Sequence, residues 1–387
     1  MKKSKKILLI AAVALILTGC ITMGAAWASL SKMSAEEIAF MQYEEQTHTI
    51  TEPFNDIIIS TINSSIQILP SSDGSCRIVC DDNEKMYHQV SFQKSEDGTV
   101  LHIAQRNEWK WYETLGGLHW EEPPVLIVYL PQAEYEILDA VSGSGDITVA
   151  PDFRFGTLHL NSTSGNTALT GIEAEYLNVL SASGDILLRS VRVSEDAYLQ
   201  NVSGFTRVEN LTASELTTYA SSGETVLENA SAEYLNTSTV SGFIRVYDGN
   251  FSNTSYFETS SGDIEIVDSE CGEQRIKTVS GKLSLQNITG ISLTTETSSG
   301  SIGIFEAFYS HSALCNTVSG EIQFSGLDAE NLEFITSSGD ISGNLRSPKN
   351  FITETSSGYM DVPPSDESAG TCSICTVSGN VSIVIDP

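Results

Sequence analysis

Four aspartates that each follow a Ser-Gly dipeptide are the residues best placed for acid–base chemistry in this sequence. They are Asp146, Asp185, Asp263 and Asp340. A pair of carboxylates at a fixed separation is what a glycoside hydrolase uses to protonate a leaving group and to activate water. Other copies of the same dipeptide are followed instead by Phe205, Phe243, Lys282 and Tyr359. We therefore expect variable surface positions, no catalytic residues and no enzyme, with a β-helical polysaccharide lyase or hydrolase as the alternative.

Cysteine and histidine are the other residue types that could do chemistry. The pair Cys372-x-x-Cys375 has no second pair beside it, and the six histidines form no cluster in the sequence, so a zinc site is not predicted. Cys76 and Cys80 lie four apart in one expected strand, too far from each other to form a disulfide within it. We expect no metal and no cofactor.

The elements that carry these residues are repeats. Thirteen Ser-Gly dipeptides recur at intervals of 19 to 21 residues, and their glycines are Gly145, Gly165, Gly184, Gly204, Gly223, Gly242, Gly262, Gly281, Gly300, Gly320, Gly339, Gly358 and Gly379. A short fixed period indicates a solenoid, because one unit cannot bury its own apolar face and must stack on its neighbours. The sequence predicts an all-β fold, a parallel, right-handed β-helix or solenoid over residues 141–387.

Each repeat reads as two strands joined at the dipeptide. Positions two and four after the glycine are mostly apolar, as at Ile264 and Ile266, which indicates a strand with one buried face. The strand before the glycine has the opposite parity, with Ser or Thr three residues upstream. Ser-Gly must therefore form a bend, which glycine adopts at little steric cost. The residue two positions before the glycine alternates between Val and Ser. This alternation leaves open whether one coil of the solenoid contains 19–20 residues or 39 residues.

Residues 50–140 lack the period and predict an N-terminal β cap, since an open solenoid end would expose core and strand edges. This segment contains Trp109, Trp111 and Trp120. These tryptophans either plug the end of the solenoid or contact a ligand such as a sugar ring. The candidate ligand-contact residues are these three tryptophans and the corner aromatics Phe205, Phe243 and Tyr359.

Residues 1–30 predict a membrane anchor or signal segment, followed by a linker at 31–49. Lysines at positions 2, 3, 5 and 6 precede an uncharged, mostly apolar run from Ile7 to Ala28, which is long enough to span a bilayer as a helix. Two alternatives stay open: a lipobox-like LTGC sequence that ends at Cys20, the residue it would lipidate, and an Ala-Trp-Ala cleavage site. We expect a single-pass N-terminal anchor in the cell membrane with extracellular repeats; a lipoprotein or a secreted protein is the alternative. The net charge of −30 disfavours nucleic acid as a partner.

The repeat motifs also carry a family resemblance. They read Thr-Ser-Ser-Gly-Asp-Ile at Thr259–Ile264 and Thr336–Ile341, and Thr-Val-Ser-Gly at Thr278–Gly281 and Thr317–Gly320. With these motifs and the Trp-rich insertion, the chain after residue 50 resembles a family of bacterial putative-adhesin domains of unknown function. The lysine-led apolar segment near the N-terminus is also similar to that family. Its relatives are the head-GIN autotransporter-adhesin-like domains.

The resemblance implies a right-handed parallel β-helix and no catalytic residues. It implies a non-enzymatic cell-surface module, a putative adhesin or an envelope-associated scaffold, and a component of an envelope-stress sensor is a further alternative. The expected partners are the membrane, through the N-terminal segment, and an extracellular or envelope protein or glycan that the sequence does not name.

Overall fold

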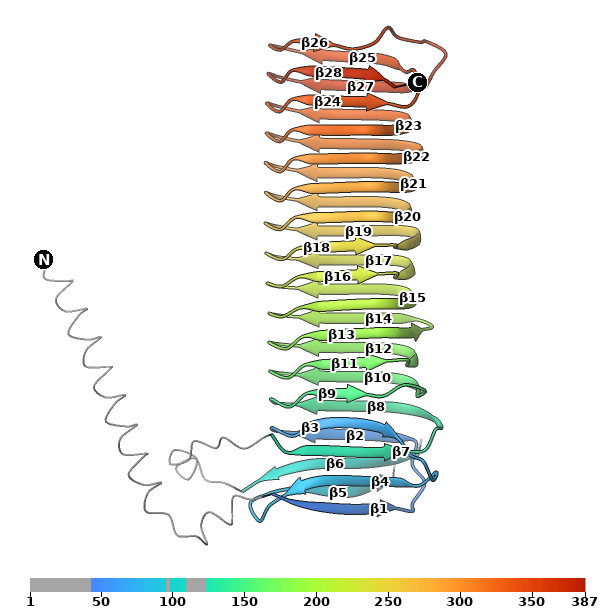
Figure 1. Cartoon of the computed structure of the whole chain (residues 1–387), viewed down its shortest axis with the longest axis vertical. Helices are drawn as coiled ribbons and strands as arrows, with labels where there is room; N and C mark the ends of the chain where they lie inside the picture. The colour runs from blue at the N-terminus through green and yellow to red at the C-terminus, as the bar shows by residue number, and fades with distance from the viewer. Residues whose placement is uncertain (1–42, 95–97, 109–122, 387) are drawn as a thin grey trace, which may run out of the picture.

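The computed structural model describes residues 43–94, 98–108 and 123–386, which form an elongated stack of β-strands (Figure 1). All regular elements in these ranges are strands, as the repeat pattern predicted. No helix that could cross a membrane occurs among the described residues. The expected anchor with Cys20, and the tryptophans at 109, 111 and 120, lie outside the described residues.

Strands that precede a Ser-Gly dipeptide form one face of the stack, here called the pre-glycine sheet. They include β8 (Glu134–Ser142), β10 (Arg154–Ser162), β12 (Glu173–Ser181), β14 (Asp196–Asn201), β17 (Ser231–Thr239) and β19 (Asn250–Thr259). Strands that follow the dipeptide form the opposite face, the post-glycine sheet. They include β9 (Ile147–Val149), β11 (Thr167–Thr170), β13 (Ile186–Val193), β16 (Thr225–Glu228), β18 (Ile244–Tyr247) and β24 (Ile341–Leu345).

Five longer strands run through both sheets, because they continue around the corner that lies opposite Ser-Gly. They are β15 (Thr206–Ala220), β20 (Ile264–Thr278), β21 (Leu283–Thr297), β22 (Ile302–Thr317) and β23 (Ile322–Thr336). The pairing is parallel: Ile244 pairs with Ile264, which in turn pairs with Leu283. Each coil is therefore a single repeat of 19 or 20 residues, which settles the question that the Val and Ser alternation left open.

The core lies between the two sheets. Ile244, Ile264, Leu283 and Ile302 are fully buried and follow one another on consecutive coils. The inward parity switches at Ser-Gly as predicted, since Thr278 before the dipeptide and Leu283 after it are both buried. Burying one such aliphatic side chain contributes about 1.5–3 kcal/mol, so the fold is stabilised by the same contact repeated along its axis.

The N-terminal end is closed by antiparallel strands. The strands here are β1 (Glu44–Ile50), β2 (Asp56–Thr61), β3 (Ser65–Pro70), β4 (Cys76–Asp82), β5 (Met86–Lys94), β6 (Thr99–Asn107) and β7 (Val125–Leu130). β2 and β3 stack in parallel on β8 and β9 and, on their other side, on β6 and β7. Parallel stacking thus continues across the boundary expected at residue 140. β5 pairs antiparallel with β6, and β4 pairs antiparallel with both β7 and β1. The strands β1, β4 and β5 therefore cover the end of the stack (Figure 1).

The last two coils at the other end are out of chain order. Their strands are β25 (Asn350–Thr355), β26 (Met360–Asp361), β27 (Thr371–Thr376) and β28 (Val381–Ile385). β27 pairs with both β23 and β25, and β28 with both β24 and β26. The coil made of β27 and β28 therefore lies between β23–β24 and the outermost coil β25–β26 (Figure 1).

This exchange explains a break in the corner alternation. Along the sequence, Ser337 and Ser356 are successive corner residues, so the strict alternation of Val and Ser fails there. In space, the coil of Val377 lies between them, because Thr376 pairs with Thr336 on one side and with Thr355 on the other. The Val and Ser corners thus alternate between neighbouring coils up to the last one.

Candidate functional site

The Ser-Gly corner is built from backbone contacts between coils. The hydroxyl of Thr259 accepts a hydrogen bond from the Gly262 N–H at 3.0 Å and donates to the Gly242 carbonyl of the preceding coil at 3.4 Å. Equivalent bonds from the glycine N–H to a Ser or Thr hydroxyl recur from Ser142 to Thr376. The hydroxyls in these bonds are paired as buried polar groups must be; Asn201 and Ala220 replace the hydroxyl on two coils, and the Thr355 hydroxyl has no hydrogen-bond partner among the described residues.

Glycine is required here for a reason that differs from the predicted one. The corner glycines do not adopt positive φ angles. A Cβ at Gly281 would instead lie 1.7 Å from the Gly262 carbonyl oxygen of the coil before it, and Gly262 has the same relation to Gly242. The missing side chain allows consecutive coils to approach each other closely.

The aspartates after Ser-Gly act as acceptors for the next coil. Asp146 accepts from the Asn166 N–H at 2.7 Å, Asp185 from the Phe205 N–H at 2.8 Å, and Asp263 from the Lys282 N–H at 2.8 Å. Asn166 takes the same role toward the Asp185 N–H. The repeated position therefore satisfies an exposed backbone donor, and we find a structural use for the residues that first suggested acid–base catalysis.

The opposite corner was not found by sequence reasoning. At this corner ten residues, one from each of ten successive coils, have φ between 51° and 71°, and they are Asp152, Gly171, Ser190, Asn210, Asn229, Asp248, Asp268, Asn287, Glu306 and Gly326. Such backbone favours Gly, Asn and Asp. Their recurrence every 19 or 20 residues, six or seven residues after each Ser-Gly glycine, is the signal that would have located the corner.

The predicted corner aromatics do not gather in one place. Phe243 is 43 % exposed and lines a small hollow of about 170 Å³, with the Arg245 guanidinium carbon 5.5 Å from its ring centre. Phe205 is half-buried two coils away, and Tyr359 is exposed on the outermost coil. Ligand contact at these residues stays a prediction.

A row of tyrosines on the pre-glycine sheet is the most distinctive surface in the described part of the chain. Five successive coils each place one tyrosine on the outer face, and together they form what we call the tyrosine stripe: Tyr176, Tyr198, Tyr219, Tyr234 and Tyr256. The first four are 36 to 48 % exposed, and Tyr256 is half-buried. At about 4.8 Å per coil the stripe extends roughly 19 Å along the axis.

The register places the tyrosines on three parallel columns of the sheet. Tyr198 pairs laterally with Asn178 and Thr217, and Tyr219 pairs with Gln200. Each ring from Tyr176 to Tyr219 is displaced by two residues from the one before, which separates neighbouring Cα atoms by about 8 Å. Tyr176, Tyr198 and Tyr219 therefore run diagonally, with amide and hydroxyl side chains between the rings, and Tyr234 returns to the column of Tyr176.

Carboxylates lie close to the tyrosine stripe, and the pKa of two of its phenols is raised. The Glu175 carboxylate raises the pKa of Tyr176, with Glu195 and Asp196 adding to it. Burial, together with a hydrogen bond to Glu258, raises the pKa of Tyr256 to about 12. The phenols of Tyr176 and Tyr256 therefore remain protonated at neutral pH, and the nearby carboxylates repel anionic ligands.

The outer face of the post-glycine sheet has a different composition. Its arginines pair with carboxylates on neighbouring coils: Arg189 Nε lies 3.0 Å from Glu209 Oε2, and Arg207 Nη2 lies 2.9 Å from Glu228 Oε1. Arg245 contacts both Glu224 and Glu265. Exposed pairs of this kind contribute about 0–1 kcal/mol each. This face satisfies its charges internally and presents few free groups to a ligand.

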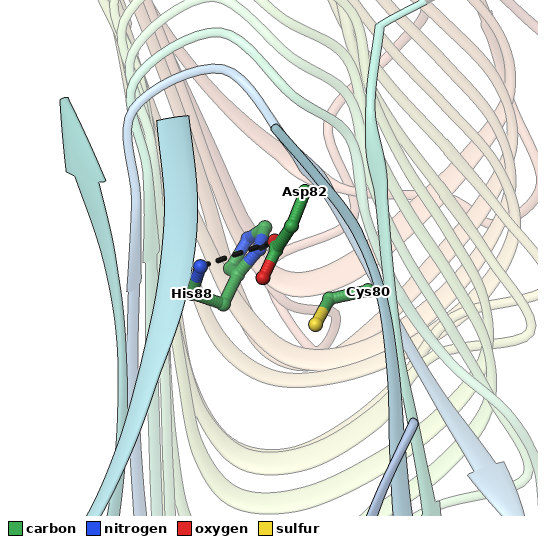
Figure 2. Close-up of side chains that lie close together, drawn as sticks. All are labelled: Cys80, Asp82 and His88. Carbon is green, nitrogen blue, oxygen red and sulfur yellow. Dashed lines mark hydrogen bonds and ion pairs between the residues drawn. The ribbon is translucent and has the colours of Figure 1, made fainter. Parts of the chain in front are cut away.

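One polar cluster lies buried in the cap. Cys80 and Asp82 point inward from β4 and His88 from β5, so the cluster joins the two sheets at the closed end (Figure 2). The Asp82 carboxylate accepts from the His88 backbone N–H at 3.1 Å and lies 2.6 Å from His88 Nδ1. Cys80 Sγ donates to the Gln46 carbonyl of β1 at 3.7 Å.

This cluster has the residue types of a thiol nucleophile with its base, but not the required ionisation. Burial and the Asp82 charge raise the pKa of Cys80 to about 12. A nucleophilic cysteine needs a lowered pKa and access for its substrate. The His88 side chain is fully buried and that of Asp82 is 11 % exposed. The geometry therefore offers ligand atoms rather than a reactive thiolate.

The fold and its repeated corners define a flat parallel β-solenoid, a class of non-globular repeat domain. Within that class the chain belongs to the Toastrack DUF4097 family, which it matches over residues 54–247 and 252–384. This confirms the expected membership of a β-helical family of unknown function. Among curated proteins none matches the chain.

One solved structure that the chain resembles is described as a putative cell adhesion protein from Clostridium sporogenes ATCC 15579. It is 10 % identical, with 89 % of this chain and 100 % of that chain covered, and the TM-score is 0.21.

Proposed function

We propose that the chain is a non-enzymatic surface module that binds a neutral glycan along the tyrosine stripe, in the manner of an adhesin. Its N-terminal segment holds it at the cell membrane with the repeats outside. The observation that carries the proposal is the stripe itself: five successive coils expose one aromatic ring each, on a flat face with amide and hydroxyl groups between the rings.

The chemistry of the stripe favours a sugar polymer as the ligand. Exposed aromatic rings supply a large contact area at low entropic cost, and phenol and amide groups hydrogen-bond to hydroxyls. No lysine or arginine faces outward from the pre-glycine sheet between β12 and β19, while Glu175, Glu215 and Glu258 do. An acidic polysaccharide or a nucleic acid would be repelled, so we infer an uncharged glycan.

The non-enzymatic part of the proposal is supported by the use of the corner aspartates. Asp146, Asp185 and Asp263 each accept a backbone hydrogen bond from the next coil. The hollow at the edge of the pre-glycine sheet is open to solvent and not an enclosed cleft, and its two arginines both pair with Glu173: Arg154 Nε lies 2.9 Å from Glu173 Oε2. A lyase or hydrolase would instead need a cleft with two available carboxylates.

The test is glycan binding by the full chain and by matched variants. We expect wild type to bind uncharged polysaccharides on a glycan array. The triple variant Tyr198→Ala/Tyr219→Ala/Tyr234→Ala should bind about 100-fold more weakly, because three rings at about 1 kcal/mol each sum to about 3 kcal/mol. Phe305→Ala is the control, since Phe305 is similarly exposed on the other sheet.

A second variant set separates the stripe from the predicted corner contacts. Phe205→Ala/Phe243→Ala/Tyr359→Ala should leave binding within twofold of wild type. If this set abolishes binding and the tyrosine triple does not, the ligand lies at the Ser-Gly corner and the stripe assignment is wrong. Release of reducing ends from the bound glycan, lost in Asp263→Ala, would overturn the non-enzymatic proposal.

The location needs its own experiment. Protease added to intact cells should digest the repeats and leave the lysine-rich end protected. Cys20→Ala should remain membrane-bound if the apolar segment spans the bilayer. Release of Cys20→Ala from the membrane would identify the lipoprotein alternative instead.

A further inference from the structure

We propose that Cys80, Asp82 and His88 form a binding site for a divalent cation of the zinc class inside the N-terminal cap. The proposal is independent of glycan binding and departs from the expectation of no metal. Thiolate, carboxylate and imidazole together suit a borderline cation such as Zn²⁺ and do not suit Ca²⁺ or Mg²⁺, which prefer oxygen ligands.

The three side chains are already close enough to share one ion. Their candidate ligand atoms all lie within 4.8 Å of one another. Ligands bound to a tetrahedral zinc at about 2.0–2.3 Å are separated by roughly 3.3–3.8 Å, so small side-chain rotations would complete the geometry. Cys80 and Asp82 are two residues apart on β4, and His88 approaches from β5 in the opposite sheet (Figure 2).

A second observation points to a ligand at this place. His88 is 4 % exposed, and its Nε2 has no hydrogen-bond partner among the described residues. A buried polar atom without a hydrogen-bond partner destabilises the fold, so a bound ligand is one explanation for it. Because Asp82 is itself a proposed ligand, the imidazole must turn to share the ion with it, and the ion would replace the present hydrogen bond between the carboxylate and His88 Nδ1.

The charge balance also favours a divalent ion. A thiolate and a carboxylate bring two negative charges, which one divalent cation neutralises, and a neutral site suits a buried position. Of the other carboxylates in the β4–β5 turn, Asp81 accepts from the Val125 N–H and Glu84 is exposed. Because the ligands come from both sheets, the ion would join the two faces of the solenoid at its closed end and contribute to the stability of the cap.

The experiment uses the full chain, reduced and stripped of metal, with Co²⁺ as a spectroscopic probe. We expect one tightly bound Co²⁺ per chain, with a thiolate-to-cobalt charge-transfer band that Zn²⁺ abolishes by displacement. Carboxylates on the acidic surface can bind Co²⁺ but cannot give this band. Zn²⁺ alone should raise the unfolding temperature of wild type.

Variants assign the site. Cys80→Ser should lose the band, and Asp82→Asn and His88→Gln should weaken Co²⁺ binding at least tenfold. Cys76→Ser is the matched control, because Cys76 is buried on the same face of β4 and should keep the band and the affinity.

Two results would overturn the proposal. One is the absence of the thiolate-to-cobalt band from the wild-type chain, a result that does not depend on any variant folding correctly. The other is a band that persists in Cys80→Ser or disappears in Cys76→Ser. In either case the cluster would be an Asp–His hydrogen bond that closes the β4–β5 turn.

Discussion

The two corners of each coil solve the same problem, reversing the chain between two sheets, by different physical means. At the Ser-Gly corner the backbone is ordinary and the constraint is space, because the carbonyl of the previous coil occupies the position of a side chain. At the opposite corner space is available and the constraint is the backbone, which is left-handed. The first corner accepts only glycine, whereas the second accepts Asn, Asp, Ser, Glu or Gly. A repeat can thus be invariant or variable at a turn according to which constraint applies.

The largest expected effect is Gly281→Ala. Its Cβ would lie 1.7 Å from the Gly262 carbonyl oxygen, so two coils must separate. We expect a loss of about 3 kcal/mol or more in the free energy of unfolding, measured as a lower denaturant midpoint. A midpoint equal to that of wild type would show that close stacking is not what selects glycine.

Thr278→Val should have the next largest effect. Valine keeps the shape but removes the hydroxyl that accepts from the Gly281 N–H at 3.1 Å. A buried donor left without a partner costs about 1–3 kcal/mol. Thr278→Ser is the control, since serine takes this role in the first three Ser-Gly coils. Equal destabilisation by both changes would assign the effect to packing instead of the hydrogen bond.

Asp263→Ala should destabilise less, by about 0.5–1.5 kcal/mol, because it removes an acceptor for the Lys282 N–H at an exposed position where water can replace it. Asp263→Asn should be close to neutral, as asparagine fills this position at Asn166. Unfolding curves for both variants measure the difference. An effect of Asp263→Asn equal to that of Asp263→Ala would mean that the negative charge, and not the acceptor oxygen, is what matters.

The smallest effect is expected at the second corner, where a change to glycine should be tolerated. Asn287 has a φ of 53° and donates from Nδ2 to Asp268 at 2.6 Å. Asn287→Gly relieves the backbone and loses this bond, so stability should change by less than about 0.5 kcal/mol. Asn287→Ala should cost about 1 kcal/mol, because alanine avoids this conformation. If Asn287→Ala is as stable as Asn287→Gly, the left-handed backbone is not the constraint at this corner and the comparison fails.

Much of the fold could be predicted from the sequence because the constraint at the Ser-Gly corner is so strict. A glycine that no other residue can replace leaves a visible period, and the parity on either side of Gly281 follows from it. The second corner tolerates several residues, so its period at Asn210, Asn229 and Asp248 was overlooked although it was present.

The candidate sites were less predictable. The tyrosine stripe depends on the lateral register, which decides whether Tyr198 and Tyr219 share a face and a neighbourhood. The cap cluster joins residues from two sheets, and the spacing of Cys80, Asp82 and His88 along the chain matches no known metal motif. Both sites depend on which coils and strands become neighbours in the fold. A single sequence reveals these neighbours only where a pattern repeats, as it does at the Val and Ser corners.

The exchanged coils at the C-terminal end have a consequence for the order of folding. A solenoid can usually grow one coil at a time as the chain is synthesised. Here β25 and β26 pair only with β27 and β28 among the described strands, so they have no edge to add to until a later segment has been made. The outermost coil can therefore join the stack only together with β27 and β28 or after them, so the last segment of the chain to be made completes an inner coil and not the tip of the stack.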